Sequence, residues 1–403
     1  MRVSGPDAFA VAGAVAGRVP TSEDAGRFFR CTFRGFGGRV LDDGLMLVFA
    51  APRSYTGEDA VEFHTHGGTV APRRVLEACF AAGARLARRG EFTLRAFLNG
   101  KLDLSAAEAT IDLVDAKTDR SADDAVARLT GAGSRRFNAL YEEALDISVA
   151  LEHSLDVSED ELPASFMDGL AERLRALLAR VRELAATARE GKILREGALV
   201  VLAGPPNAGK SSLLNALLGE RRAIVGDVAG TTRDSIEEWM EMGGWPVRLT
   251  DTAGLREADD AVEAEGVARA RALADRADLV VALDCCIPGA LLVHAKCDLG
   301  RGEGLNVSAV TGEGLEELKS AVAARLETLA ARGDEVAAGD VTTRQRELLE
   351  EAATALEDHV RTLDPVLAAE GARRAADALG RIVGRTYSAD LLDSLFSRFC
   401  VGK

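Results

Sequence analysis

The sequence lacks the long apolar run that a membrane-spanning helix needs, since no stretch approaches ~18 uncharged residues, and no signal peptide opens the chain. It also lacks paired cysteines at zinc-binding spacing. Its six cysteines are scattered, and the adjacent pair Cys285 and Cys286 is unsuited to a shared metal loop. Reduced thiols in the cytoplasm are the simplest interpretation. These absences predict a cytoplasmic protein with no membrane segment.

The chain has enough apolar residues for several ordinary cores. At 403 residues it is long enough for roughly two to four domains. Its 47% hydrophobic and 28% charged residues are typical of folded proteins rather than disordered ones. The net charge of −15 is uneven: residues 1–101 carry +4, residues 361–403 carry +2, and the middle carries −21. Anionic ligands are therefore expected at the two ends, and a general nucleic-acid coat is disfavoured.

The stretch 204–211 reads Gly-x4-Gly-Lys-Ser, the pattern of a nucleotide-binding phosphate loop. An apolar run of strand length, 198–203, precedes it and a helical run, 212–218, follows it, as this motif requires. The backbone N–H groups of such a loop turn inward and bind phosphate. Lys210 is predicted to reach the β- and γ-phosphates, and the Ser211 hydroxyl to bind Mg²⁺. The alternative is a glycine-rich turn with a chance lysine.

The residues that follow supply other parts of a phosphoryl-transfer site. In the polar segment 230–234, Thr232 is placed to complete the Mg²⁺ shell and to sense the γ-phosphate. The run 247–251 is a strand ending in Asp251, which can hold the metal through water. Gly254 then offers its N–H to the γ-phosphate.

The choice of base rests on the tetrapeptide 295–298, which follows the predicted strand 290–294. Asp298 can accept hydrogen bonds from N1–H and the 2-amino group of guanine, a pattern that adenine lacks. The backbone N–H groups of a later segment, at Ser308 and Ala309, are expected to contact the base. Together with the phosphate loop, this order of motifs predicts GTP hydrolysis. The nucleotide site is predicted to comprise Asn207, Ala208, Gly209, Lys210, Ser211, Ser212, Gly226, Val228, Thr231, Thr232, Asp251, Gly254, Lys296, Asp298, Ser308 and Ala309.

Two features depart from the usual pattern of such a site. We call the tetrapeptide 295–298 the guanine loop. Ala295 stands where an asparagine normally tethers this loop to the phosphate loop, so weaker nucleotide affinity is expected. Only 285–289 separates the strand 279–284 from the strand 290–294, whereas neighbouring parallel strands need a crossover of about a dozen residues. The crossover helix is therefore missing, or the two strands are connected in another way.

The pattern of elements predicts a multidomain α/β protein. Short strand-like runs and one helix at about 71–83 indicate an N-terminal α+β domain. Helical periodicity over 105–186, with a break at 158–163, returns over 343–403. Between these, 197–330 alternates strands and helices. We therefore expect one helical domain built from two segments, with an inserted P-loop GTPase (Ras-like) domain; two unrelated helical pieces are the alternative. The predicted boundaries are 1–100, 101–195, 196–333 and 334–403.

Three long motifs show a family resemblance. The segments 54–68 and 90–104 resemble the N-terminal domain of the MnmE (TrmE) family of tRNA-modification GTPases. The end of the chain, 396–403, is similar to that family's C-terminal Cys-x-Gly-Lys signature, and Asn207 and 230–234 fit it too. The resemblance covers nearly the whole chain.

The resemblance implies a homodimer formed through a tetrahydrofolate-binding N-terminal domain. With the FAD-dependent partner MnmG, in a heterotetramer, such proteins modify C5 of the wobble uridine of certain tRNAs. The one-carbon unit comes from 5-formyl- or 5,10-methylene-tetrahydrofolate. The resemblance also implies that potassium, rather than an arginine finger, sits at the phosphates and drives the two GTPase domains together.

The resemblance assigns further residues. Glu263 matches the catalytic glutamate that orients water, and the folate contacts match Arg2, Glu62, Lys101 and Lys403. Potassium is held by Asn207, Gly226, Val228 and Thr231.

Several features leave alternatives open. Without the resemblance, Arg2, Glu62 and Lys101 would be read as ordinary surface or capping residues. His64 and His66 share one strand face, but we interpret them as structural rather than as metal ligands. Cys400 is either a nucleophile or a buried or merely reactive thiol.

Two further departures bear on the resemblance. The family's first strand, expected some 20 residues before Arg2, has no counterpart, so a truncated start with an incomplete folate pocket is expected. The segment 151–156 replaces a more apolar family segment, which is expected to alter the hinge between helices.

Two functions from different classes follow. The first is GTP hydrolysis coupled to tRNA wobble-uridine modification. The second is a GTPase switch or assembly factor whose N-terminal domain only dimerises and binds partners.

Overall fold

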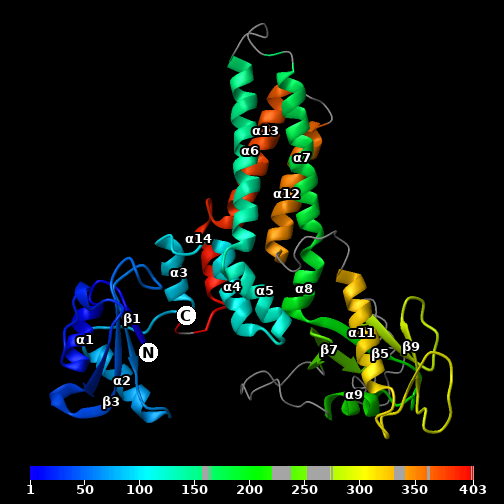
Figure 1. The fold of residues 1–403 in the computed structure, drawn as a ribbon, viewed down its shortest axis with the longest axis horizontal. Coiled ribbons are helices and arrows are strands. Elements are labelled where there is room, and N and C mark those ends of the chain that lie inside the picture. Colours follow the sequence, from blue (N-terminus) through cyan, green and yellow to red (C-terminus); the bar gives the residue numbers. More distant parts are fainter. Residues whose placement is uncertain are drawn as a thin grey trace, which may run out of the picture. The chain divides into compact units, whose positions relative to one another are not determined.

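The structure is a computed structural model that describes residues 1–156, 163, 165–219, 237–251, 273, 276–330, 341–360, 364–400 and 402. The chain divides into two compact units: residues 1–111 with 380–403, and residues 112–379 (Figure 1). Each unit has its own buried apolar clusters.

The first unit contains a four-stranded antiparallel sheet in the order β1-β4-β3-β2. Along one strand Met46 and Val48 are fully buried while Leu45 is exposed, because alternate side chains point to opposite faces. Two strand-like runs of the sequence, 39–41 and 45–50, lie mostly within this one strand, β3. The strands are β1 (Arg2–Ser4), β2 (Phe28–Arg34), β3 (Val40–Phe49) and β4 (Ala60–His64).

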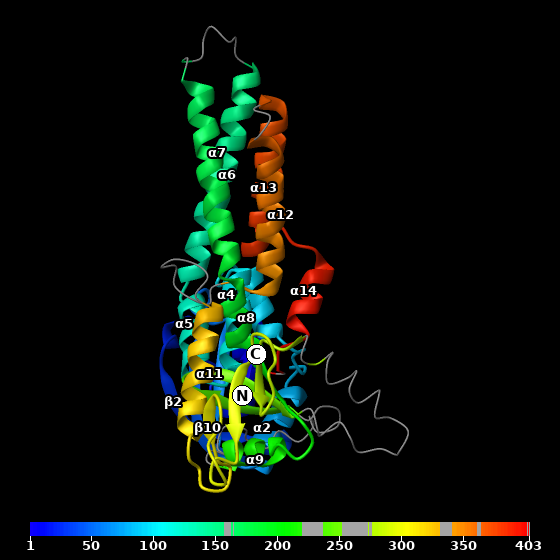
Figure 2. The same ribbon diagram turned by 90° about the vertical axis from the view of Figure 1, so that its right-hand side faces the viewer.

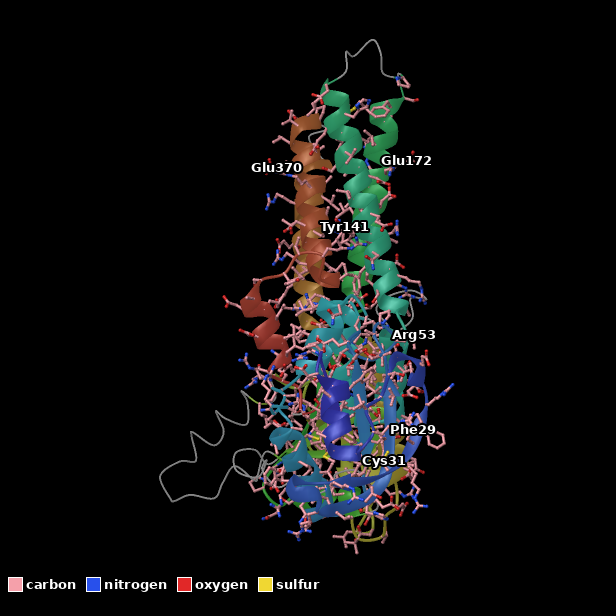
Figure 3. The ribbon with its side chains drawn as sticks, turned by 90° about the vertical axis from the view of Figure 1, so that its left-hand side faces the viewer. Phe29, Cys31, Arg53, Tyr141, Glu172 and Glu370 are labelled. Carbon is pink, nitrogen blue, oxygen red and sulfur yellow. The ribbon has the colours of Figure 1, made fainter. Side chains whose placement is uncertain are left out.

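Helices α1 (Ala8–Ala16) and α2 (Val70–Ala81) bury their apolar residues against this sheet. The helix predicted at about 71–83 is therefore confirmed. The cluster includes Cys31 of β2, labelled in Figure 3, together with Val11, Val75 and Cys79. Two short 3-10 turns, η1 (Ser22–Asp24) and η2 (Phe36–Gly38), join these elements.

The end of the chain packs within the first unit. Helix α14 (Ala389–Phe396) lies against α3 (Glu91–Leu98), and Phe97, Leu392 and Phe396 share an apolar cluster with the start of α4 (Leu104–Asp115). Gly90 has φ 65°, and a Cβ there would lie 2.6 Å from the Phe396 carbonyl oxygen. Only glycine fits this close approach without displacing the backbone.

The second unit contains a bundle of long helices. Its members lie side by side in Figures 1 and 2. In α6, the buried residues Phe137, Leu140, Ala144, Ile147 and Leu151 recur every three or four positions and form one apolar face. The bundle helices are α6 (Ala132–Asp156), α7 (Phe166–Ala186), α12 (Thr343–Val360) and α13 (Pro365–Val383).

Helices from before and after the α/β region pack together in this bundle. Arg182 of α7 pairs with Glu357 of α12 at 2.5 Å, and the Ser148 hydroxyl of α6 donates to the Ala369 carbonyl of α13 at 3.4 Å. The expectation of one helical domain built from two segments is thus confirmed. The shorter helices α5 (Asp119–Leu129) and α8 (Ala188–Glu196) complete this part. The predicted break at 158–163 lies almost entirely outside the described residues.

The α/β part of the second unit is a six-stranded sheet in the order β10-β9-β8-β5-β7-β6. Only the edge strand β6 runs antiparallel to its neighbour. The central strand β5 is apolar throughout because both of its faces are covered. The elements are β5 (Ala198–Ala203), α9 (Lys210–Gly219), β6 (Glu237–Met242), β7 (Trp245–Asp251), β8 (Leu279–Leu283), β9 (Leu291–Ala295), β10 (Leu305–Val307) and α11 (Leu315–Ala330).

Strands β8 and β9 are parallel neighbours joined by a short link without a helix. Their register pairs Val281 with Leu291 and Leu283 with Val293. Only three residue pairs align, so the chain has to run back only about 10 Å from the end of β8 to the start of β9. The short link between the two strands is long enough to cover this distance. Asp284 begins the reversal with φ 51°, and its carboxylate lies 2.7 Å from His294 Nδ1. The crossover helix is absent, as the sequence indicated, yet the parallel pairing persists.

Among the helices of the described residues, none combines the length and the apolar character that crossing a membrane requires.

Candidate nucleotide-binding site

The phosphate loop lies between β5 and α9, as predicted. Asn207 has φ 63° and Gly209 has φ 92°, so the loop turns through two left-handed residues before the helix begins. A Cβ at Gly204 would lie 2.6 Å from the carbonyl oxygen of Leu283 in β8, so this position must be glycine. The loop therefore presents its backbone N–H groups at the N-terminus of α9, where phosphate binds readily.

Lys210 is held over this loop. Its side chain is almost fully buried, and Nζ donates hydrogen bonds to the carbonyl oxygens of Gly204 and Pro205, each at 2.9 Å. These contacts hold the ammonium at the loop. The position suits a cation that stabilises charge on the β- and γ-phosphates.

Ser211 and Asp251 bring two oxygen ligands together from different elements. The Ser211 hydroxyl, in the first turn of α9, donates to Asp251 Oδ2 at the end of β7 at 2.5 Å. Asp251 is almost fully buried. A hydroxyl and a carboxylate at a phosphate loop are the hard oxygen donors that Mg²⁺ prefers, so the residues fit the predicted metal.

The guanine loop is positioned by the ends of β9 and β10. The fully buried Ser308 donates from its hydroxyl to Asp298 Oδ1 at 2.6 Å. This bond fixes one carboxylate oxygen of Asp298 and leaves the other available to a base. The loop is also tied to the strand, because the Cys297 N–H donates to the Val307 carbonyl at 3.2 Å.

The guanine loop and the phosphate loop are joined directly. Lys296 Nζ donates to the Asn207 carbonyl at 2.7 Å, and Lys296 has φ 59°. The sequence indicated that Ala295 removes a tether at this place. The lysine bond is a tether that sequence reasoning missed, although Lys296 itself was predicted in the site.

A cavity of about 390 Å³ lies at the phosphate loop. Its lining brings together residues from the phosphate loop, the first turn of α9 and the guanine loop: Pro206, Asn207, Gly209, Lys210, Ser211, Ser212 and Lys296. Asp298 lies in the adjoining loop after β9, and Ser308 and Ala309 follow β10. The predicted residues Gly226, Val228, Thr231, Thr232, Gly254 and Glu263 lie outside the described residues.

A second site lies in the first unit, where Arg2 and Glu62 were predicted to contact folate. The two form an ion pair across β1 and β4, with Arg2 Nε and Nη2 each 2.8 Å from Glu62 Oε1. The guanidinium carbon of Arg2 lies 4.8 Å from the Tyr55 ring centre and 5.5 Å from that of Phe92. Lys101 instead donates to the Pro52 carbonyl at 3.0 Å.

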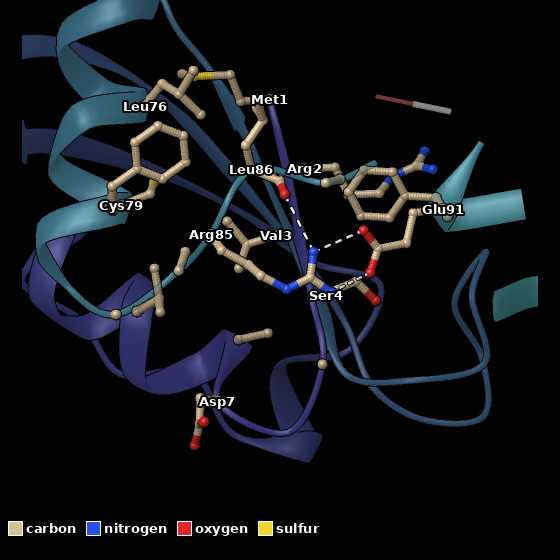
Figure 4. A pocket seen from close by; sticks show the side chains of 18 of the residues that line it. Met1, Arg2, Val3, Ser4, Asp7, Leu76, Cys79, Arg85, Leu86 and Glu91 are labelled. Atoms are coloured by element: carbon tan, nitrogen blue, oxygen red, sulfur yellow. Dashed lines mark hydrogen bonds and ion pairs between the residues drawn. The ribbon is translucent and has the colours of Figure 1, made fainter. Parts of the chain in front are cut away.

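Arg2 also lines a cavity of about 460 Å³, shown in Figure 4. Glu62 and Lys101 do not line it, whereas Gly402, next to the undescribed Lys403, does. The cavity contains Arg85, Glu91 and Arg95, which sequence reasoning missed.

Glu91 organises these two arginines. Its carboxylate lies 2.9 Å from Arg85 Nη1 and 2.7 Å from Arg95 Nη2, and it accepts a bond from the Arg88 N–H at 2.7 Å. The bond from Arg85, with those from Arg88 and Arg95, lowers the pKa of Glu91 to about 2 against the opposing effect of burial. The only sequence signal was the cluster of arginines just before the 90–104 motif.

The histidines and cysteines of the first unit contact neighbouring residues or solvent. His66 Nδ1 lies 2.8 Å from Asp42 Oδ1 and His64 Nε2 lies 3.6 Å from Glu62 Oε2. Among the described residues, no group of three or more His, Cys, Asp or Glu side chains could hold a metal ion. The Cys400 side chain is exposed, whereas burial raises the pKa of the Cys79 thiol to about 11 and makes that cysteine unreactive.

A mainly parallel sheet with a phosphate loop between its central strand and the following helix is the arrangement of a P-loop GTPase. Two family descriptions match the chain: "GTP-binding protein TrmE N-terminus" over residues 1–101 and "MnmE helical domain" over residues 104–400.

Curated relatives match over the whole length. A protein from Xanthomonas campestris pv. campestris (strain B100) is 42% identical over 431 aligned positions, covering 100% of this chain and 95% of the relative. One from Acidiphilium cryptum is 43% identical, with the same coverage. Both are named tRNA modification GTPase MnmE. Among solved structures, the G domain of the T. maritima FeoB iron transporter is 28% identical, covering 32% of this chain and 98% of that one, with a TM-score of 0.23. The chain belongs to the MnmE (TrmE) family.

Proposed function

We propose that this GTPase acts in tRNA modification in the cytoplasm. As a homodimer, and in a heterotetramer with an FAD-dependent MnmG-like partner, it modifies C5 of the wobble uridine of certain tRNAs. The one-carbon unit comes from 5-formyl- or 5,10-methylene-tetrahydrofolate. The observation that carries the proposal is the 42% identity to tRNA modification GTPases across the entire chain, with matches in both the N-terminal and the helical parts.

The nucleotide site supports the hydrolytic half of this proposal. Lys210 binds the β- and γ-phosphates, and Asp298 selects guanine. Ser211 and Thr232 hold Mg²⁺, with Asp251 behind Ser211. When bound, Mg²⁺ neutralises charge that develops between the β- and γ-phosphates. Glu263 orients the attacking water; it and Thr232 lie outside the described residues.

Potassium is proposed to replace an arginine finger. Asn207 offers a side-chain amide oxygen beside the phosphates, and the segment with Gly226, Val228 and Thr231 supplies backbone oxygens. Asn207 stands at the turn of the phosphate loop with φ 63°, and its carbonyl is already held by Lys296. A monovalent cation there supplies positive charge during cleavage of the β–γ bond, and it favours dimerisation of the GTPase domains.

The cavity around Arg2 supports folate binding in the first unit. Its aromatic and aliphatic walls, including Phe92, Phe80 and Leu86, suit a flat pterin ring, and Arg2, Arg85 and Arg95 suit an anionic glutamyl tail. Glu62 is paired with Arg2 but does not line the cavity, so its proposed bond to the pterin edge rests on the family resemblance. Lys403 follows Gly402 of the cavity wall and is proposed to contact the ligand. Lys101, bonded to Pro52, is the least supported member of the predicted set.

Nucleoside mass spectrometry tests the proposal. In a strain lacking this chain, the modified wobble uridine should disappear from bulk tRNA, and the parent chain should restore it. Lys210→Ala, which removes the phosphate-binding ammonium, should not restore it. Unchanged wobble nucleosides in the deletion strain would reject the proposal in favour of a GTPase switch or assembly factor.

A further inference from the structure

Four side chains form a contact cluster that the nucleotide site does not use. The Arg120 cluster consists of Arg120, Glu190, Trp245 and Glu327. Arg120 Nη2 lies 2.8 Å from Glu190 Oε1, and Nη1 lies 2.9 Å from Glu327 Oε2. The guanidinium carbon lies 3.9 Å from the centre of the Trp245 ring, and Trp245 Nε1 donates to the same Glu327 oxygen at 3.2 Å. Each of the four side chains thus has at least one bonded or stacked partner within the cluster.

The cluster is buried on one side and open on the other. Trp245 is 1% exposed and the Glu190 side chain is 10% exposed, whereas the Glu327 side chain is 59% exposed. Burial alone would lower the pKa of Arg120, but its bonds to Glu327 and Glu190 raise it. The planar guanidinium of Arg120 stacks on the Trp245 indole and also bonds two carboxylates. A lysine has no planar group and cannot make all of these contacts at once.

The cluster joins the helical part of the second unit to its α/β part. Arg120 lies in the first turn of α5, Glu190 in α8, Trp245 at the start of β7 and Glu327 in α11. A second contact lies beside it, where Lys117 Nζ is 6.0 Å from the ring centre of Trp239 in β6. The β6–β7 hairpin is therefore contacted at Trp245 by α5 and at Trp239 by Lys117, which lies just before α5.

This hairpin leads directly into the nucleotide site. Strand β7 begins at Trp245 and ends at Asp251, whose carboxylate accepts the bond from Ser211. The turn between the strands packs closely on α11, since a Cβ at Gly243 would lie 2.6 Å from the Ala323 Cβ. A strand bonded to neighbours on both sides, as β7 is to β5 and β6, transmits a shift at one end to the other.

We propose that Arg120 is a positioning residue that couples the helical part to the nucleotide site through β7. It touches neither nucleotide nor metal. It holds Trp245, and Trp245 fixes the register of the strand that places Asp251 behind Ser211. In P-loop GTPases the contacts of the γ-phosphate and Mg²⁺ change on hydrolysis. Those changes alter the contacts of Asp251 at the end of β7. By thermodynamic linkage they also alter the contact between Trp245, at the start of β7, and Arg120 of α5.

The chain offers a local reporter for this coupling. Its two tryptophans, Trp239 and Trp245, both lie on the hairpin, so intrinsic tryptophan fluorescence reports on the surroundings of this hairpin. The experiment compares the tryptophan emission of the full chain with GDP and with a non-hydrolysable GTP analogue. The parent protein should change its emission between the two nucleotides. Arg120→Ala should reduce that change at least about fivefold.

Kinetics separate positioning from a general structural role. Arg120→Ala should lower kcat for GTP at least about fivefold while KM stays within about twofold, because the residue orders β7 rather than binding nucleotide. Arg120→Lys keeps the charge but loses the stacking, so its kcat should lie between those of the parent and of Arg120→Ala. The double variant with Glu327→Gln should be no slower than Arg120→Ala alone, since both changes act through one cluster.

Arg173→Ala is the matched control. It removes an exposed arginine whose 2.9 Å ion pair with Glu143 joins α6 and α7, away from the hairpin. This control should keep the parent kcat and emission change. The proposal is overturned if Arg120→Ala keeps both parent values, or if Arg173→Ala loses them equally. If Arg120→Ala does not fold, Arg120→Lys and Glu327→Gln carry the same comparison, and parent-like values in both overturn it.

Discussion

Lys296 Nζ donates a 2.7 Å hydrogen bond to the Asn207 carbonyl, and this bond ties the guanine loop to the phosphate loop. The loop proposed to bind the base is therefore joined directly to the phosphate loop, although Ala295 lacks the amide that normally joins them. The tether comes from the residue next to Ala295.

Removing this tether should weaken nucleotide binding. Lys296→Met keeps the aliphatic stem but loses the charged donor, so GTP affinity should fall by about tenfold. Ala295→Asn should then change affinity by less than about threefold, because the loops are already joined. Isothermal titration with GDP and a GTP analogue measures both. A large gain in Ala295→Asn with no loss in Lys296→Met would show that the lysine bond is unimportant.

The choice of base should depend on Asp298. Asp298→Ala removes the acceptor for N1–H and the 2-amino group of guanine, so the preference for GTP over ATP should fall by about a hundredfold or more. Ser308→Ala, which removes only the 2.6 Å bond that orients Asp298, should cost about tenfold. Competition binding with the two nucleotides checks both values. Equal effects of the two variants would argue that Asp298 acts structurally.

Hydrolysis should respond to the monovalent cation. At equal ionic strength, phosphate release should be faster in potassium than in sodium, and Asn207→Ala should erase the difference because its side-chain oxygen is lost. Glu263→Ala should slow hydrolysis in both salts with little loss of GTP binding. Identical rates in potassium and sodium for the parent protein would leave the cation without a role.

Acid should destabilise the first unit through Glu91. Its pKa is about 2 in the folded protein, against an ordinary value of 4.5, because Arg85, Arg88 and Arg95 bond the charged form. The stabilisation is fully present above pH 4.5 and is lost as the pH falls toward 2, with a maximum on the order of 3 kcal/mol. Glu91→Gln should be less stable than the parent at pH 6, and the difference should shrink toward pH 3. Thermal melts across this range test it, and a difference independent of pH would contradict it.

Local patterns predicted much of the fold, including the phosphate loop between β5 and α9. The apolar strand at 198–203, the glycine loop and the following helix lie adjacent in sequence, so β5 and α9 were predicted correctly. The pairing of β8 with β9 was harder, because the short link contains no helix to indicate a crossover. The bonds of Lys296 to Asn207 and of Arg120 to Glu327 join residues 89 and 207 positions apart, and no local pattern encodes such pairs.

GTP turnover by the purified chain tests the central claim most directly. With Mg²⁺ and potassium, the parent protein should release phosphate from GTP and not from ATP. Lys210→Ala, which removes the buried ammonium bonded to the loop carbonyls of Gly204 and Pro205, should abolish that release and strongly weaken GTP binding. Normal GTP turnover in Lys210→Ala would contradict the assignment of the nucleotide site and the account built on it.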